Sequence, residues 1–230
     1  MLAEIEPLPG VEQPLRAGDV VLEVNGQSVV EFNDIYAAAV AMPAPGPMRF
    51  TVERDGSRLT FDAPFAMPPL VQGVEPLSPA SAAGLRPGDV IVAADGRPLT
   101  AFEELRETVM ASAGRTIPLE VWRAGETLEL PIMPLERDAD DGQGGFERRV
   151  MIGVAGASLY LPATETPAPW TAIGLGAERM VMVITQSLNG LKHILIGAIG
   201  ADNLQGPIGI AQISGETASQ GLASFVALIA

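Results

Sequence analysis

One stretch of this chain occurs twice. Residues 17–26 read AGDVVLEVNG, and residues 87–96, seventy positions later, read PGDVIVAADG. Each copy follows a Leu-Arg pair, has a Phe six residues after its last Gly, and is followed by an Arg-x-Gly turn, at residues 54–56 and 123–125. A repeat of this length indicates two copies of one small folding unit.

Each copy predicts a short buried strand between two turns. Gly18 and Gly88 stand where the chain must turn before an apolar run, a place that favours positive φ. The runs at 20–24 and 90–94 are short and mostly apolar, which is typical of buried strands. The Asn-Gly and Asp-Gly pairs that follow them are strong hairpin signals, because both central residues of a type I′ turn need positive φ.

A helix is expected after the second hairpin. Residues Thr100 to Glu103 read TAFE, an S/T-x-x-E capping box. An apolar stripe at helical spacing follows, made of Phe102, Leu105, Val109 and Met110. A second hairpin is predicted over 116–130. Each copy is therefore expected to be a small β-rich unit with one amphipathic helix.

The second copy resembles a known family. Residues 78–91 read SPASAAGLRPGDVI and are followed by Asp95-Gly96, which resembles the signature of bacterial circularly permuted PDZ domains. The resemblance implies a mixed β/α fold with two tandem, circularly permuted PDZ domains, each a small barrel-like sheet with one or two helices. The alternative is an unrelated β domain with a Pro-Gly-Asp turn, which explains one copy but not the same order of elements twice.

Composition narrows the classes of partner. The net charge of −14 argues against binding of nucleic acid or anionic lipid as the main role of the folded part. The chain has no Cys, so disulfides and thiolate metal sites are excluded. The first six residues show neither the basic region nor the apolar core of a signal peptide, and we expect the chain to be a fragment of a longer protein.

The last third has a different pattern. Residues 159–170 contain three Pro and predict an extended connector. Residues 171–199 carry apolar side chains at helical spacing. Twelve residues separate Arg179 from Lys192, too few for a transmembrane span, so an amphipathic helix in a membrane interface is expected. The alternative is a helix packed on the neighbouring PDZ domain. The apolar residues at the end are expected to begin a transmembrane helix.

The order of these segments resembles the site-2 protease family of intramembrane zinc metalloproteases. The resemblance rests on the tandem PDZ domains, the amphipathic helix, the sequence NLQGPIGIA at 203–211 and a Gly-x-x-x-Phe apolar segment at 221–225. It implies regulated intramembrane proteolysis of anti-sigma factors or signal-peptide remnants in the bacterial inner membrane. The PDZ pair would face the periplasm and filter substrates by size or by a newly exposed C-terminus. The implied partners are C-terminal or extended peptide segments of membrane-protein substrates and the membrane, with no nucleic acid.

The expected domains follow the same resemblance. They are an incomplete first PDZ domain at 1–66, a second PDZ domain at 67–157, a connector with a membrane-surface helix at 158–205, and a loop with the start of a transmembrane helix at 206–230.

The catalytic motifs of that family do not occur in this sequence. Its zinc site needs a His-Glu-x-x-His helix, and an Asp in a later Leu-Asp-Gly motif. The chain has a single His, His193, and neither motif. We therefore expect zinc in the complete protein, no catalytic residue and no metal ligand in this chain, and no proteolysis by this chain alone.

A peptide site is predicted in the second copy. PDZ domains add an extended peptide to a sheet edge beside a helix and hold the terminal carboxylate in a Gly-containing turn. In permuted PDZ domains that turn and strand come last, which implies residues 150–156. The expected peptide-binding residues are Ile152, Gly153, Val154, Leu105, Val109 and Arg149. The alternative is that this strand only closes the sheet and its apolar side chains are core.

Two further expectations concern this site. Gly153→Val should abolish peptide binding without unfolding the domain. The first copy, where no apolar-Gly-apolar strand precedes the junction to the second, should lack a complete groove.

Two other functions share the PDZ signature. One is the PDZ portion of a serine protease of the high-temperature-requirement type, and the other is a non-enzymatic secretion scaffold. A His-Glu-x-x-His motif encoded upstream and a Leu-Asp-Gly motif downstream would favour the metalloprotease. A His/Asp/Ser protease domain upstream would exclude it.

Overall fold

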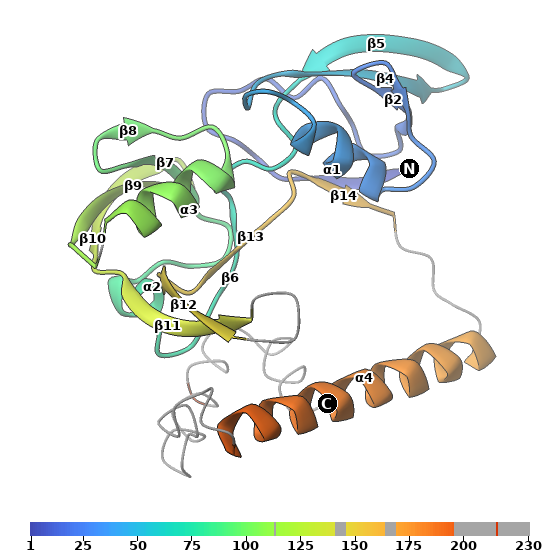
Figure 1. Ribbon diagram of the computed structural model, residues 1–230. Helices are drawn as coiled ribbons and strands as arrows, with labels where there is room; N and C mark the ends of the chain where they lie inside the picture. The colour runs from blue at the N-terminus through green and yellow to red at the C-terminus, as the bar shows by residue number, and fades with distance from the viewer. Residues whose placement is uncertain (113, 141–145, 164–168, 196–214, 216–230) are drawn as a thin grey trace. The chain divides into compact units, whose positions relative to one another are not determined.

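The computed structural model describes residues 1–112, 114–140, 146–163, 169–195 and 215. The chain forms two compact units, Met1–Leu135 with Val150–Thr164, and Glu136–Arg149 with Glu165–Ala230. The first unit holds both copies of the repeat, which are coloured blue and green in Figure 1.

Each copy contains an antiparallel four-stranded sheet with the same strand order. The first sheet has the order β3-β2-β4-β5, and its strands are β2 (Val20–Val24), β3 (Gln27–Ser28), β4 (Met48–Arg54) and β5 (Ser57–Ala63). The second has the order β8-β7-β9-β10, with β7 (Val90–Ala94), β8 (Arg97–Pro98), β9 (Ile117–Arg123) and β10 (Glu126–Ile132). The strands predicted at 20–24 and 90–94 are confirmed as β2 and β7. The mixed β/α class is confirmed as well.

The turns of the two sheets also match. Gly18 and Gly88 have φ of 95° and 88°, as predicted from their place before an apolar run. Both central residues of each hairpin after β2 and β7 have positive φ, as a type I′ turn requires. The same holds for the two Arg-x-Gly turns, which join β4 to β5 and β9 to β10.

A buried Asp and an Arg hold each sheet to the turn that precedes it. In the second copy, Arg123 donates from Nε and Nη2 to the two carboxylate oxygens of Asp89, both at 2.7 Å, and the Asp89 side chain is 1% exposed. Arg54 contacts Asp19 in the same bidentate way at 2.6 and 2.7 Å. Burial raises the pKa of Asp19, but the hydrogen bonds from Arg54 and from the Arg16 N–H outweigh burial and hold that pKa below its ordinary value.

The start of each copy pairs with a strand from the end of the unit. Strand β6 (Val71–Val74) pairs with β13 (Val154–Gly156), and β1 (Leu2–Ile5) pairs with β14 (Tyr160–Pro162). The registers are equivalent, with a bulge at the same step. In the second copy the Glu75 N–H donates to Gly153 O at 2.9 Å, and in the first the Glu6 N–H donates to Leu159 O at 3.0 Å.

Strand β14 is the feature that the sequence analysis did not find. The first copy has no such strand before the junction, but the segment that leaves the second copy at β13 continues to the first and supplies β14 (Figure 1). The crossing is fixed to the linker between the copies, because the Ala157 N–H donates to Leu70 O at 2.8 Å and the Leu159 N–H donates to Ala66 O at 3.0 Å.

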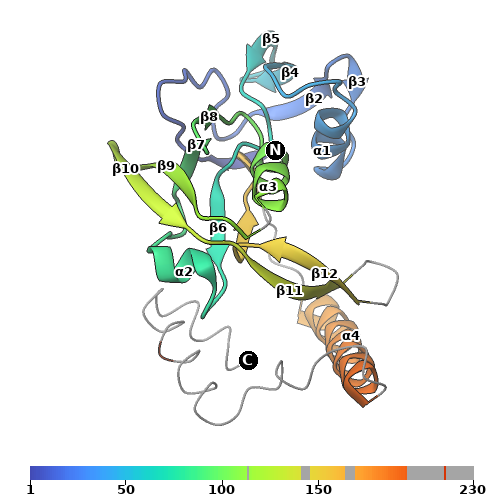
Figure 2. The ribbon, with the colours of Figure 1, turned by 60° about the vertical axis from the view of Figure 1, so that its left-hand side comes forward.

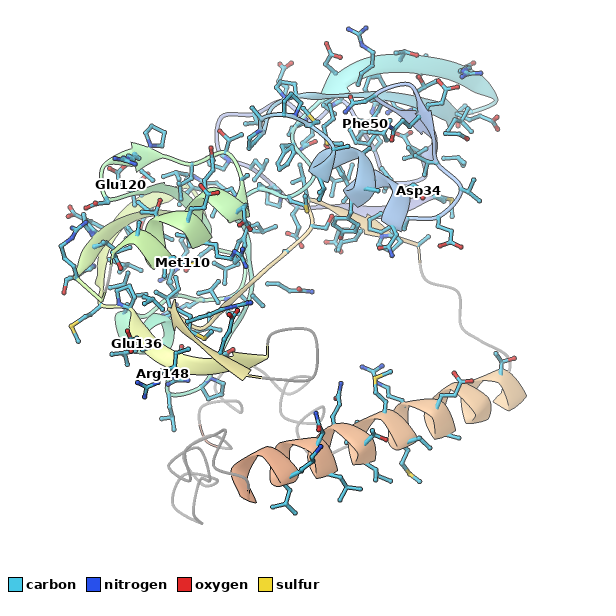
Figure 3. The ribbon with its side chains drawn as sticks, viewed as in Figure 1. Asp34, Phe50, Met110, Glu120, Glu136 and Arg148 are labelled. Atoms are coloured by element: carbon cyan, nitrogen blue, oxygen red, sulfur yellow. The ribbon has the colours of Figure 1, made fainter. Side chains whose placement is uncertain are left out.

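Each copy has its own hydrophobic core. The first includes Leu2, Ile35 and Phe50 from the copy itself, with Leu159 and Tyr160 from the returning segment. Figure 3 labels Phe50, whose ring meets that of Tyr160 edge-on at a centroid distance of 5.2 Å. The Tyr160 hydroxyl donates to Pro64 O at 2.7 Å, and burial raises the pKa of this phenol.

Three short helices belong to the first unit. They are α1 (Asn33–Val40), α2 (Pro79–Ala83) and α3 (Phe102–Ala111). Helix α2 begins after Ser78, whose hydroxyl accepts from the Ser81 N–H at 3.1 Å. The predicted capping box at α3 is wrong by one residue. The N-cap residue is Ala101, not Thr100, so the helix begins one residue later than predicted. Glu104, not Glu103, therefore accepts from the Thr100 and Ala101 N–H groups, at 2.6 and 2.9 Å.

The second unit contains a hairpin and a long helix. The hairpin joins β11 (Leu135–Asp140) to β12 (Phe146–Met151), and Arg148 lies 3.8 Å from the Glu136 carboxylate across it (both labelled in Figure 3). Helix α4 runs over Pro169–Leu195, which confirms a helix where 171–199 was predicted helical.

Helix α4 exposes apolar side chains around its circumference. Five consecutive apolar residues, 180–184, are all at least half exposed, so this stretch has no polar face. The Thr185 and Ser187 hydroxyls donate to carbonyls four residues earlier, at 2.8 Å each. Among the described residues, no helix has the length and apolar character needed to span a bilayer. Of residues 206–230, where a loop and the start of a transmembrane helix were predicted, the structure describes only residue 215.

Candidate peptide-binding site

The candidate site is the turn that leads into β13. Gly153 has φ of 76°, the left-handed region that favours glycine. The carbonyl of Ile152 accepts from the Ala80 N–H of α2, and the carbonyl of Gly153 accepts from the Glu75 N–H that follows β6, both at 2.9 Å. Both carbonyls therefore point into the second copy, toward α2 and β6.

The orientation of these carbonyls fixes that of the next two N–H groups. In a trans peptide the N–H of one residue points opposite to the carbonyl of the residue before it. The described chain has no cis peptide bond. The N–H groups of Gly153 and Val154 therefore point away from α2 and β6, and the Gly153 N–H donates to no other described backbone group. Successive N–H groups in such a turn form an anion-binding concavity.

The edge of β13 continues this polar surface. Strand β13 pairs with β6 on one side, and no other described strand pairs with it. Because Glu75 and Gly153 are hydrogen-bonded, the next pair, Val74 and Val154, is the non-bonded kind, and the backbone groups of Val154 face outward. An edge of this kind can accept an added strand.

Helix α3 contacts the end of β13. Figures 1 and 2 show α3 in the same copy as β6 and β13. The contact between them is at Gly156, where an added Cβ atom would lie 2.7 Å from Cδ2 of Phe102. The first residue of α3 thus touches the last residue of β13.

The structure places the predicted apolar residues mostly in the core. Ile152, Leu105 and Val109 are 5%, 2% and 3% exposed and pack together in the second core, as the core alternative expected. Val154 is half-buried at the edge of the same core. Met110, labelled in Figure 3, is 46% exposed on α3, although it was predicted on the apolar stripe. A role for these side chains in ligand binding stays a prediction.

Arg149 belongs to the second unit, and the other predicted residues belong to the first. Arg149 lies on β12, where its guanidinium pairs with the Glu147 carboxylate. A role for its charge beside a bound carboxylate stays a prediction.

The structure contradicts the expectation that Gly153→Val would leave the fold intact. A Cβ atom at this position would lie 2.4 Å from Cβ and 2.8 Å from Oγ of Ser78, the N-cap residue of α2. A β-branched residue also resists positive φ. A change at Gly153 therefore tests folding before it tests binding.

The first copy has an equivalent strand, β14, but the N–H groups at its start are already hydrogen-bonded. The residues equivalent to Gly153 and Val154 are Leu159 and Tyr160. The Leu159 N–H donates to Ala66 O at 3.0 Å, and the Tyr160 N–H donates to the Ser158 hydroxyl at 3.2 Å. Leu159 is fully buried and does not have positive φ. Among the described residues, a turn with a positive-φ glycine and outward N–H groups before this strand thus occurs in the second copy and not in the first.

Comparison with known proteins identifies relatives of this chain. The family profile described as PDZ domain matches residues 70–123. A protein named "Putative zinc metalloprotease" from Rhizobium meliloti is 33% identical over 67% of this chain and 42% of its own length. A protein of the same description from Neisseria meningitidis is 26% identical over the whole chain and 58% of its own length. The regulator of sigma-E protease RseP of Escherichia coli is 30% identical over 70% of this chain and 36% of its own length.

These matches leave much of each relative outside the chain, which spans about two fifths to three fifths of their length. Within the described residues, no three His, Asp or Glu side chains are grouped in a way that could hold a metal ion. These residues therefore do not fit a zinc site, and we assign them no step that uses zinc. The chain is a PDZ-containing homologue of the zinc metalloproteases that include the regulator of sigma-E protease.

Proposed function

We propose that the second copy binds free C-terminal ends of polypeptides for an intramembrane zinc metalloprotease whose catalytic residues lie outside this chain. The observation that carries the proposal is the pair of outward N–H groups of Gly153 and Val154 beside the edge of β13 that no other described strand pairs with. A carboxylate held by that pair would place the residues before it along β13, where backbone hydrogen bonds supply affinity. The substrates would be cleaved membrane proteins, such as anti-sigma factors or signal-peptide remnants, presented in the periplasm.

We further propose that both copies are circularly permuted PDZ domains. In each copy, the strand that pairs with the beginning of the domain lies after its other strands in the sequence. The equivalent registers, hydrogen bonds and Asp–Arg pairs support a common fold for the two copies. On this reading the first domain is residues 1–66 completed by β14, and the second domain is inserted into it. The first domain would then hold the second in place and not read C-termini.

The test uses one peptide in two forms with the full chain. A peptide with apolar C-terminal residues and a free carboxylate should bind, and the same peptide with a C-terminal amide should bind at least tenfold more weakly. Amidation removes the charge that the two N–H groups would hold, and charge-assisted hydrogen bonds contribute roughly 1.5–3 kcal/mol. Titration calorimetry measures both affinities.

The two peptides have the same sequence and differ only in the C-terminal group, so a difference in affinity reports the carboxylate alone. Equal affinity of acid and amide would show that the Gly153 turn does not hold a carboxylate. Absence of binding for a panel of C-terminal sequences would remove peptide binding as the function of this site.

Helix α4 supports a second part of the proposal, contact with the membrane. Its middle is apolar on all sides, and such a helix needs an apolar environment. We expect the full chain to co-float with zwitterionic vesicles, and Ile184→Glu to weaken this at least tenfold, because burial of one such side chain contributes about 1.5–3 kcal/mol. Gln186→Glu, which adds the same charge at a polar position two residues on, is the control. An unchanged distribution for Ile184→Glu would instead favour packing of α4 on protein.

A further inference from the structure

Helix α4 carries a stripe of apolar residues at heptad spacing. The members of this seam, at alternating steps of four and three residues, are Ala177, Val181, Ile184, Leu188 and Leu191. All five are exposed, Val181 and Leu188 at 62%. Between residues 185 and 192 the only apolar side chains are Leu188 and Leu191, so this half of the helix is apolar along the seam and polar elsewhere. Such spacing is typical of helices that pack together in a coiled coil.

The residues beside the seam place opposite charges symmetrically. Glu178, Thr185 and Lys192 each follow a seam residue directly and lie seven residues apart, so they occupy the same flank of the seam. All three are exposed. At 1.5 Å per residue, Glu178 and Lys192 lie about 10 Å to either side of Thr185 along the helix. The flank therefore has a negative end, a neutral middle and a positive end.

The direction of packing decides which flanks meet. Two parallel copies are related by an axis along the helices, so the flank with Glu178 on one helix lies against the opposite flank of the other, which carries Met180 and Ser187. Two antiparallel copies are related by an axis across the helices, so like flanks meet in reverse order. Glu178 of each copy then faces Lys192 of the other. Only the antiparallel arrangement pairs these charges.

We infer that α4 pairs with α4 of a second copy of this chain in an antiparallel coiled coil. The seam would pack Val181 on Leu191 of the other copy and Ile184 on Leu188. The seam covers just over two heptads and coiled coils generally use about three or four, so the dimer should be weak, with a Kd on the order of 100 µM.

This pairing goes beyond the function proposed above and is compatible with it. Met182 and Val183 are exposed and lie outside the seam, so the dimer leaves them available to a membrane. At protein concentrations well below the expected Kd, the vesicle experiment tests α4 as a monomer.

Cross-linking tests the arrangement. The chain has no Cys, so each single variant carries one thiol. In the full chain, a short bismaleimide should join two copies through Thr185→Cys, because the two Thr185 residues meet near the axis. Gln186→Cys, one position further from the seam, should give at least fivefold less dimer. Ala177→Cys should also give little, because the antiparallel arrangement puts its two copies at opposite ends. Cross-linking through Ala177→Cys in place of Thr185→Cys would show parallel pairing and overturn the inference.

Charge exchange tests the cause. Glu178→Lys brings like charges together at both ends of the seam, and so does Lys192→Glu, so each variant alone should dimerise at least fivefold more weakly in sedimentation equilibrium. In an equal mixture every flank pair again has opposite signs, and dimerisation should return to within about twofold of the parent chain. Arg179→Glu, which makes the same charge change as Lys192→Glu outside the flank, is the control and should leave the Kd unchanged.

Two results would contradict the pairing. A mixture that dimerises no better than either variant alone would show that the flank charges do not face each other. A parent chain that stays monomeric well above the expected Kd, with no cross-link through Thr185→Cys, would show that a second copy does not cover the seam. Neither result bears on carboxylate binding at Gly153, which belongs to the other unit.

Discussion

Asp89→Ala is expected to lower the free energy of unfolding of the first unit by about 3 kcal/mol. The Asp89 carboxylate is 1% exposed and accepts from Arg123 at two atoms and from the Arg86 N–H at 2.8 Å. Removal of the Asp89 carboxylate leaves the mostly buried Arg123 charge without its counterpart, and breaking a buried ion pair in this way costs roughly 3–5 kcal/mol in proteins. The lower end applies because the Arg123 side chain is 24% exposed. Urea unfolding of the full chain measures the change.

The chain offers a matched control for this pair. Arg115 also contacts a carboxylate at two atoms, at 3.1 and 2.7 Å, but its partner Asp95 is 35% exposed and Arg115 itself is 58% exposed. Water can solvate Asp95 when Arg115 is removed, so Arg115→Ala should change stability much less than Arg123→Ala, which leaves the buried Asp89 without its partner; neither Arg has positive φ. The same geometry with different burial isolates the effect of burial.

A double substitution distinguishes pairing from packing. Asp89→Ala with Arg123→Ala should cost less than the sum of the two single changes, because no buried charge is left alone. Additive costs would show that the two side chains stabilise the sheet independently.

The sequence predicted the parts of each copy better than their connections. Strands, glycine turns and helices depend on local patterns, and β2, β7 and the hairpins follow those patterns closely. Both members of the Asp89–Arg123 pair lie in motifs that the repeat exposes, yet they are 34 positions apart, and only the folded sheet brings them together. Their repetition as Asp19 and Arg54 was the available signal, since paired motifs that recur together can be in contact.

Strand β14 shows a different limit. A groove strand in the first copy was expected to show an apolar-Gly-apolar pattern next to that copy in the sequence. The strand that fills the place comes from residues 160–162, beyond the second copy, and has Leu159 where the pattern expects Gly. Non-local pairing of three residues leaves little trace in a single sequence. The equivalent registers of the β1–β14 and β6–β13 pairs can be seen only in the folded structure.

The candidate site was located by sequence but not resolved by it. Gly153 and β13 lie where they were expected, while Leu105, Val109 and Ile152 are core residues in the structure. An apolar strand beside an apolar helix gives one sequence pattern for both a groove wall and a core. Only the burial of the side chains in the folded structure distinguishes a groove wall from a core. The direction of the Gly153 and Val154 N–H groups depends on backbone hydrogen bonds, which residue types do not specify.

Gly153→Val is expected to have the other large effect, a loss of about 3–5 kcal/mol of stability. A positive φ costs a β-branched residue roughly 1–3 kcal/mol, and forcing its Cβ to within 2.4 Å of Ser78 Cβ adds a packing cost of similar size. The loss should appear as a lower urea midpoint for the full chain. Gly73→Val is the control: Gly73 lies on the paired strand β6, has no atom within 4 Å of its Cβ position and lacks positive φ, so Val there should be neutral or stabilising.

The two causes at Gly153 can be measured separately. Ser78→Gly alone should cost only a few tenths of a kcal/mol, because Gly is a good N-cap. In that background Gly153→Ala no longer meets the Ser78 side chain, so its remaining cost reports the positive φ. If Gly153→Ala costs the same with and without Ser78→Gly, the overlap with Ser78 contributes nothing and backbone conformation alone requires glycine at the turn. If the cost falls by half or more, the turn is held as much by the close approach of α2 as by φ, and the outward direction of the Gly153 and Val154 N–H groups depends on the N-cap of that helix.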